Sequence, residues 1–88
     1  MELYSLLTLD RRDARIRKLL EGLEKQPLRY KQLIRIWLLA DGNLASLSKT
    51  LKWMIMKGYV RKEEVKNRYS PYEISNVGVK YLNGLRAK

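Results

Sequence analysis

The sequence contains neither cysteine nor histidine, and these two absences exclude much of the chemistry that proteins perform. Without cysteine there is no disulfide framework and no thiolate nucleophile, and without either residue zinc and haem sites lose their usual ligands. A histidine general base and a Ser-His-Asp triad are likewise excluded. Catalysis by carboxylates or lysine remains formally possible, but no spacing in the chain indicates it. We therefore expect a protein that is not an enzyme and that holds no cofactor or metal.

Acidic residues are scarce relative to basic ones. The chain has 9 aspartates and glutamates against 19 lysines and arginines, which gives a formal net charge of +10. Such an excess implies an anionic partner, for which nucleic acid is the default. The alternative is a thermophile protein with a charged surface, but a balanced excess of both signs would fit that class better. The charge therefore favours binding to nucleic acid.

Long hydrophobic runs are absent as well. The most apolar run, residues 33–40, is interrupted by Arg35 and is far too short to span a bilayer. Residues 1–4 lack the cationic region and the apolar core of a secretory signal. We therefore expect a cytoplasmic protein that does not enter a membrane. The 88 residues, of which 45% are hydrophobic, are enough for one folded domain with a modest core.

Helical periodicity predicts two helices in the first half of the chain. The first covers residues 10–26, with a cap at Thr8 or Asp10, and ends before Pro27. Its outer side is basic, and its inward stripe consists of Ile16, Leu19, Leu20 and Leu23. The second covers residues 30–40 and is expected to turn inward Leu33, Ile34, Trp37 and Leu38. Ile36 and Leu39 add apolar surface beyond one core contact, which indicates burial on two sides or a subunit contact.

Residues 43–57 predict a third helix, which Asn43 caps and Gly58 ends. Its apolar face consists of Leu47, Leu51 and Met54, in line with Gly58. The opposite face carries Ala45, Lys49, Lys52, Trp53 and Met56, and no acid occurs between residues 41 and 63. Small, hydroxyl and cationic side chains on an exposed helix face suit the major groove of DNA. The same pattern also fits an ordinary core helix with a solvated basic back.

The remaining segments predict a β-hairpin over residues 59–74 and a last helix over residues 75–86, capped by Ser75. The last helix is expected to turn inward Val77, Tyr81, Leu82 and Leu85. The N-terminal segment, residues 1–9, has apolar side chains that need cover, at Leu3, Tyr4, Leu6, Leu7 and Leu9. Either the core of their own chain or a second copy provides that cover. We expect an α+β fold, mainly α, in one domain over residues 1–88.

Three stretches, in this order, resemble parts of a winged helix domain: residues 27–33 (PLRYKQL), residues 47–51 (LSKTL) followed by 57–60 (KGYV), and residues 71–78 (PYEISNVG). They are similar to the start of the second helix, the recognition helix and the second wing strand of small prokaryotic regulators of the HxlR and MarR type. The resemblance covers residues 10–85. It implies a winged helix-turn-helix with a three-helix core, a two-stranded wing and a C-terminal helix.

The resemblance also implies a function, namely sequence-specific binding of double-stranded DNA by a transcriptional regulator. The recognition helix would enter the major groove, and the wing would contact the backbone or the minor groove. Two features depart from the pattern of those regulators. The link before the third helix is longer, with Gly42 and Asn43 in place of the usual apolar turn residue. In addition, Trp53 and Met56 lie on a face that is usually polar, so they either pack under the wing or the N-terminal segment or contact another chain.

Residues for contact with DNA follow from these positions. Contacts in the groove are expected from the first two turns of the third helix, at Ser46, Ser48, Lys49 and Thr50. Contacts with phosphate are expected from Lys52 and from the start of the second helix, at Arg29 and Lys31. Contacts from the wing tip with the backbone or the minor groove are expected at Lys66 and Arg68.

The expected partners are double-stranded DNA and a second copy of the chain. A homodimer doubles the small footprint of one domain, and its expected interface is the N-terminal segment with Tyr81, Leu82 and Leu85 of the last helix. So small a core shows no obvious pocket for a small-molecule effector. Two other classes remain open: a protein-interaction module that uses Trp53, Met56 and Ile36, and a binder of RNA or single strands that stacks bases on Tyr69 and Tyr72.

Overall fold

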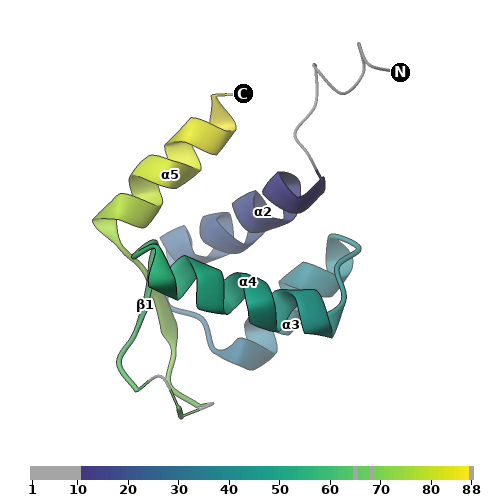
Figure 1. The fold of residues 1–88 in the computed structure, drawn as a ribbon, viewed down its shortest axis with the longest axis vertical. Helices are drawn as coiled ribbons and strands as arrows, with labels where there is room; N and C mark the ends of the chain where they lie inside the picture. Colours follow the sequence, from purple (N-terminus) through teal and green to yellow (C-terminus); the bar gives the residue numbers. More distant parts are fainter. Residues whose placement is uncertain (1–10, 65, 68, 88) are drawn as a thin grey trace.

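The computed structural model describes residues 11–64, 66–67 and 69–87, which form an α+β fold that is mainly helical (Figure 1). The elements in chain order are α2 (Arg11–Lys25), α3 (Tyr30–Leu39), α4 (Leu44–Met56), β1 (Val60–Lys62), β2 (Tyr72–Ile74) and α5 (Asn76–Arg86). These bounds agree with the predicted elements to within a few residues. The expected N-terminal segment, its apolar residues and the caps at Thr8 or Asp10 lie outside the described residues. Within the described part, no helix is both long and apolar enough to cross a membrane.

The core forms where α2 meets α3, α5 and β2. The predicted stripe of α2 is confirmed, since Ile16, Leu19, Leu20 and Leu23 are all buried. The predicted stripe of α4 is also confirmed, since Leu47, Leu51 and Met54 are buried. Trp37 is the largest of the fully buried side chains and joins α3 to this core. The burial of so many apolar groups is the main term that stabilises a domain of this size.

Two inward positions were predicted wrongly. Leu38 of α3 is half exposed, because Leu33 and Trp37 take the inward face of that helix. Val77 of α5 is also half exposed, because the adjacent Gly78 is the buried residue. A Cβ at Gly78 would collide with the carbonyl oxygen of Tyr59, so only glycine lets α5 approach this closely. Residues 78, 82 and 85 then face the core at helical spacing.

The turn between α3 and α4 is fixed by contacts from three directions. Asp41 adopts a positive φ of 64°, and the N–H of Gly42 donates to the carbonyl of Trp37 at 2.9 Å. The Arg15 guanidinium on α2 donates to the carbonyl oxygens of Ala40 and Asp41, each at 2.9 Å. The predicted cap is confirmed, since Asn43 Oδ1 accepts from the N–H of Ser46 at 2.9 Å. The long link is therefore an ordered turn that holds α4 against α2 and α3.

The hairpin leaves the C-terminal end of α4 and extends away from the helices (Figure 1). Gly58 has a positive φ of 78°, as predicted, and lets the chain turn from α4 toward β1. β1 pairs antiparallel with β2 within the predicted hairpin and ends at Lys62. The extended piece before α3 joins the hairpin, since Leu28 and Tyr72 exchange backbone hydrogen bonds of 3.1 and 2.7 Å. Ser75 caps α5, as predicted, by accepting from the N–H of Gly78.

Candidate nucleic-acid interface

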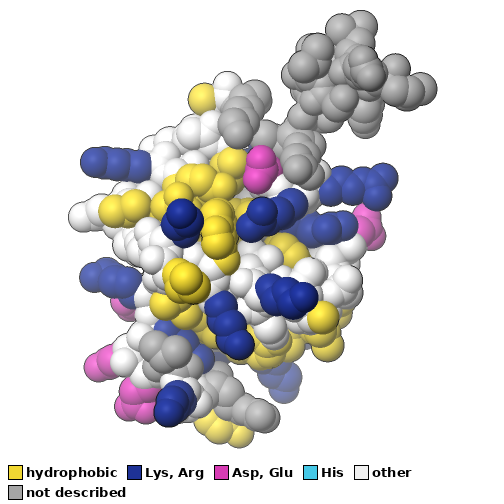
Figure 2. Space-filling view, viewed as in Figure 1, with side chains coloured by type: hydrophobic (Ala, Val, Ile, Leu, Met, Phe, Trp, Pro, Cys, Tyr) yellow, Lys and Arg dark blue, Asp and Glu magenta, His cyan; other side chains and the backbone are white. Residues whose placement is uncertain are grey.

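The outer side of α4 forms an exposed, basic ridge. Its exposed residues are Ala45, Ser48, Lys49, Lys52 and Met56, and its first turn contains no acid. On the face that α4 presents, Lys and Arg side chains surround a hydrophobic patch, while Asp and Glu side chains lie mainly toward the margins (Figure 2). The ridge is therefore a positively charged surface that stands away from the core.

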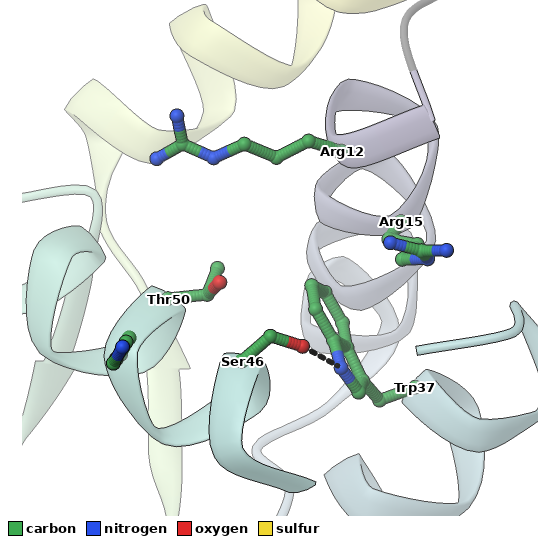
Figure 3. Close-up of a pocket in the computed structure, with 6 residues that line it drawn as sticks. Arg12, Arg15, Trp37, Ser46 and Thr50 are labelled. Carbon is green, nitrogen blue, oxygen red and sulfur yellow. Dashed lines mark hydrogen bonds between the residues drawn. The ribbon is translucent and has the colours of Figure 1, made fainter. Parts of the chain in front are cut away.

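Two of the residues predicted to contact bases in the major groove of DNA are not on this ridge. Thr50 is only 7% exposed, because it completes the inward stripe with Leu47 and Leu51. Ser46 is half-buried, and its hydroxyl is engaged: it accepts from the Trp37 indole N–H at 3.1 Å and donates to the carbonyl of Asn43 at 2.9 Å (Figure 3). Thr50 is therefore buried too deeply for the predicted contact with bases, whereas Ser46 lies at the edge of the ridge with its hydroxyl engaged. Ser48 and Lys49 are exposed.

One groove runs between α2 and α4, and we call it the α2 groove. It has a volume of about 390 Å³ and is lined by Arg12, Arg15, Trp37, Ser46, Lys49 and Thr50. Arg12 extends from α2 across toward α4, and its guanidinium lies 4.8 Å from the centre of the Trp53 ring (Figure 3). Arg15 lies 5.9 Å from the centre of the Trp37 ring. These contacts hold two arginine side chains beside Lys49 in a fixed arrangement.

A second, larger groove lies on the other side of α4, and we call it the hairpin groove. Its volume is about 1020 Å³. The start of α3 contributes Arg29, Tyr30, Lys31 and Ile34 to its lining. α4 contributes Ser48 and Lys52, and the hairpin contributes Lys62, Lys66, Tyr69 and Tyr72. Of these described side chains, five are cationic and none is acidic, which gives the groove a positive potential.

The start of α3 strengthens the positive potential of the hairpin groove. Its first turn carries no acid, and the N-terminal end of a helix has a partial positive charge from its unpaired N–H groups. The Gln32 side chain accepts from the N–H of Arg29 at 2.9 Å, which holds the backbone at the start of the helix. The Tyr30 hydroxyl lies 3.2 Å from the hydroxyl of Ser48, so α3 and α4 meet at the floor of the groove.

Several acids lie elsewhere and are paired. Glu24 and Glu21 on α2 face Arg86 of α5, with a shortest distance of 2.7 Å from Arg86 Nη2 to Glu24 Oε1. The hydrogen bond from Arg86 holds the pKa of the Glu24 carboxyl below its ordinary value. Among the residues that the structure describes, no acidic side chain lines either groove. This acidic pair on α2 is therefore engaged with Arg86 and lines neither groove.

The structure brings most of the sequence-predicted residues together, although on two sides of one helix. Arg29, Lys31, Ser48, Lys52 and Lys66 meet in the hairpin groove. Lys49 lies on the side of the α2 groove with Ser46 and Thr50, and Arg68 lies outside the described residues. The sequence analysis missed Arg12, Arg15 and Lys62. The i, i+3 spacing of Arg12 and Arg15 placed them on one helix face, but only the tertiary fold sets that face beside α4.

Trp53 belongs to an aromatic cluster and is not a free surface side chain. It is half-buried and lies edge-on to Tyr59 at 5.6 Å and to Tyr81 at 6.0 Å, while Tyr59 and Tyr81 stack at 4.2 Å. Burial, with a smaller effect of Asp13, raises the pKa of the Tyr81 hydroxyl. Trp53 therefore packs within its own chain, against Tyr59 before β1 and against Tyr81 of α5. Met56, in contrast, is 85% exposed.

Comparisons of the chain with protein-family models, with curated proteins and with solved structures find no significant match. Within the described residues, no group of three or more acidic side chains is placed to hold a metal ion. The features of the chain that bear on its function are therefore the geometry and the charge of the surface around α4.

Proposed function

We propose that the chain is a winged helix transcriptional regulator that binds double-stranded DNA, with α4 in the major groove. The observation that carries the proposal is the basic ridge of α4 between two grooves that are lined by cations. No acid lines either groove among the described residues. The order of the elements supports it, since a helix-turn-helix is followed by a two-stranded hairpin and a further helix. In this proposal the hairpin of β1 and β2 corresponds to the wing.

The shape of duplex DNA matches this charge distribution. The major groove is about 12 Å wide and admits one α-helix, and a phosphate backbone lies on each side of it. With α4 in the major groove, one backbone would pass Arg12 and Arg15, and the other would pass Arg29, Lys31 and Lys66. Contacts with phosphate provide affinity, while base contacts provide specificity. Ser48 and Lys49 are the exposed polar side chains of the ridge that would contact base edges.

The test is the salt dependence of binding to duplex DNA. Affinity should fall steeply as salt rises, because bound lysines and arginines release counterions from the duplex. A Lys49→Ala, Lys52→Ala double variant should bind more weakly, and the loss of the phosphate contact expected from Lys52 should reduce the slope of log affinity against log salt by about 0.9. Fluorescence anisotropy with a labelled duplex measures both quantities.

The matched control is a Lys25→Ala, Lys80→Ala double variant, which loses the same charge from exposed helix positions. Neither lysine lines a groove, so affinity and slope should change much less. Equal effects of the two double variants would contradict a specific role of α4.

A separate experiment, the selection of bound duplexes from a random pool, would identify the preferred sequence. A palindromic product would indicate a two-fold dimer.

A protein-interaction module is the second candidate. The observation that favours it is an exposed apolar corner at the turn between α3 and α4, formed by Leu38, Leu39 and Leu44. Exposed apolar patches often mark contacts with proteins. Binding to a protein partner that does not depend on salt, without binding to duplex DNA, would favour this second function.

A further inference from the structure

The hairpin groove contains one aromatic side chain that duplex binding does not use. Tyr69 lines the groove at the tip of the hairpin, and it is 72% exposed. Within the described part of the chain, its ring makes no contact with another aromatic ring or with a cation. A large apolar ring in that position leaves a hydrophobic face open to solvent, in a groove that otherwise attracts phosphate.

The backbone beneath Tyr69 is well organised. The backbone N–H of Asn67 donates to the carbonyl of Glu64 at 3.0 Å, and the carbonyl of Asn67 accepts from the N–H of Ser70 at 3.1 Å. The side-chain Oδ1 of Asn67 accepts from the backbone N–H of Tyr69 at 2.9 Å. Ser70 itself is buried. The hairpin tip therefore presents Tyr69 from a hydrogen-bonded turn, which reduces the entropy that a contact with its ring would cost.

The other tyrosine that the sequence offered for stacking is not available. Tyr72 is only 7% exposed, and the ammonium group of Lys62 lies 4.6 Å from its ring centre and donates to its hydroxyl at 3.4 Å. Tyr30 is half-buried at the floor of the groove, with its hydroxyl at Ser48. Tyr69 is thus the tyrosine of this groove whose ring is open to a ligand.

An exposed aromatic ring beside cations is the arrangement that binds unpaired bases. A base stacks on the ring and the cations hold the flanking phosphates, whereas the bases of an intact duplex are already stacked on each other. Lys62 and Lys66 lie on the same hairpin and line the same groove. Ser48 and Lys52 of α4 line it too, so a duplex placed on α4 would have one strand directed toward Tyr69.

We propose that Tyr69 stacks on an unpaired base where a duplex bound at α4 opens into single strand, and that Lys62 and Lys66 hold the phosphates of that strand. The proposal rests on the proposed function, because α4 holds the duplex part of the ligand. The preferred ligand is then a duplex with a single-stranded tail or a locally open site. Blunt duplex binds through α4 and the two grooves without using Tyr69.

Binding of three DNA probes to the full chain tests this: a blunt duplex, the same duplex with a short single-stranded tail on either strand, and the tail strand alone. The wild-type chain should bind one of the tailed duplexes about tenfold more tightly than the blunt duplex, since one stacked base contributes on the order of that factor. Tyr69→Ala should remove this preference and leave the affinity for the blunt duplex unchanged. Tyr69→Phe should retain it, because phenylalanine keeps the ring.

A spectroscopic measurement separates stacking from a structural role. With 2-aminopurine as the first unpaired base, stacking on Tyr69 should quench its fluorescence in the wild-type and Tyr69→Phe complexes but not in the Tyr69→Ala complex. Val77→Ala, which removes an exposed apolar side chain of α5 outside both grooves, should behave as the wild type does.

Two results would overturn the inference while the proposed function stands. One is equal affinity of the wild-type chain for tailed and blunt duplexes. The other is an equal loss on both probes in Tyr69→Ala, which would make Tyr69 a contact to the duplex itself. A wild-type chain that binds none of the duplexes would instead overturn the proposed function.

Discussion

At the scale of single residues, two neighbours on α4 have different roles. Lys49 is exposed on the ridge, while Thr50 is buried beneath it. Both occur in the same short polar stretch, and successive side chains of an α-helix are rotated by about 100° around the helix axis. A rotation of that size is enough to move a side chain from the surface into the core. The ridge is therefore narrower than the stretch of polar residues that predicted it.

Lys49→Ala should reduce sequence preference more than affinity in general. Lysine on the outer face of a recognition helix can donate to guanine O6 and N7, so its loss should cost about 1–3 kcal/mol on the preferred site and much less on random duplex. The free energy of unfolding should change by less than about 0.5 kcal/mol, since the position is exposed. Anisotropy with the two duplexes measures the ratio. Equal weakening on both would make Lys49 a phosphate contact instead.

Asp41→Gly should stabilise the fold by about 0.5–1 kcal/mol, because glycine adopts the positive φ of this position without the cost that a side chain adds. Gly42→Ala is the paired variant and should destabilise by about 1–3 kcal/mol, since its Cβ would collide with the Trp37 indole. Urea unfolding followed by tryptophan fluorescence measures both. A loss of stability in Asp41→Gly would show that the aspartate side chain itself supports the turn.

At the scale of elements, α5 is attached to α2 by a buried apolar contact and by a surface ion pair. Leu82 and Leu85 are in the core, and Arg86 at the end of α5 reaches Glu24 and Glu21. A surface ion pair adds little to stability at neutral pH. It does, however, make that stability depend on pH, because its carboxylate must stay ionised.

The ion pair should lose its effect on acidification. The pKa of Glu24 is lowered in the folded chain, mainly by the hydrogen bond from Arg86, so the unfolded chain binds the proton more readily. The stabilisation is therefore complete above the ordinary carboxyl pKa of 4.5 and is lost as pH falls through the lower folded value. Glu24→Gln should unfold at a lower temperature than the wild type at neutral pH.

This difference in melting temperature should shrink below the ordinary pKa. Glu63→Gln is the control, since Glu63 is exposed and makes no ion pair with the residues that the structure describes. A difference between Glu24→Gln and the wild type that is independent of pH would mean that the glutamine acts by another route. Thermal unfolding by circular dichroism over a pH series decides between the two.

At the scale of the whole molecule, the dimer interface predicted from the last helix is wrong in part. Leu82 and Leu85 lie in the core of their own chain, so they are not available to a partner. Among the described residues, the exposed apolar corner at Leu38, Leu39 and Leu44 is a surface whose burial against a second copy would stabilise a dimer. The expectation of a homodimer itself stays a prediction, and this corner is the place to test it.

Light scattering at micromolar concentration should show a dimer, and Leu39→Lys should shift it to a monomer, because Leu39 is 82% exposed and central to the corner. Two copies of a chain with a net charge of +10 repel each other, so added salt should strengthen the dimer while it weakens binding to DNA. A monomer under all these conditions would contradict the prediction and leave one domain as the binding unit.

The order of the elements, most of their caps and the net charge follow from the sequence alone. Asn43, Gly58 and Ser75 were assigned correctly as two caps and a stop, because capping and positive φ depend on hydrogen bonds and backbone freedom within one helical turn. The inward stripes of α2 and α4 followed from periodicity for the same reason. Such short-range rules are satisfied in the same way wherever the element lies in a fold.

Which side chains share a surface depends on how the elements pack against one another. Arg15 reaches the turn after α3 across 25 residues, and Lys62 and Arg29 meet in one groove from different elements. Trp53 is covered by Tyr59, which precedes β1, and by Tyr81 of α5. Gly78 is buried in place of Val77 because α5 packs closely against the backbone of Tyr59. These outcomes depend on many weak contacts between segments far apart in the chain. No periodicity within one segment can encode them, because each is settled only when the elements pack together.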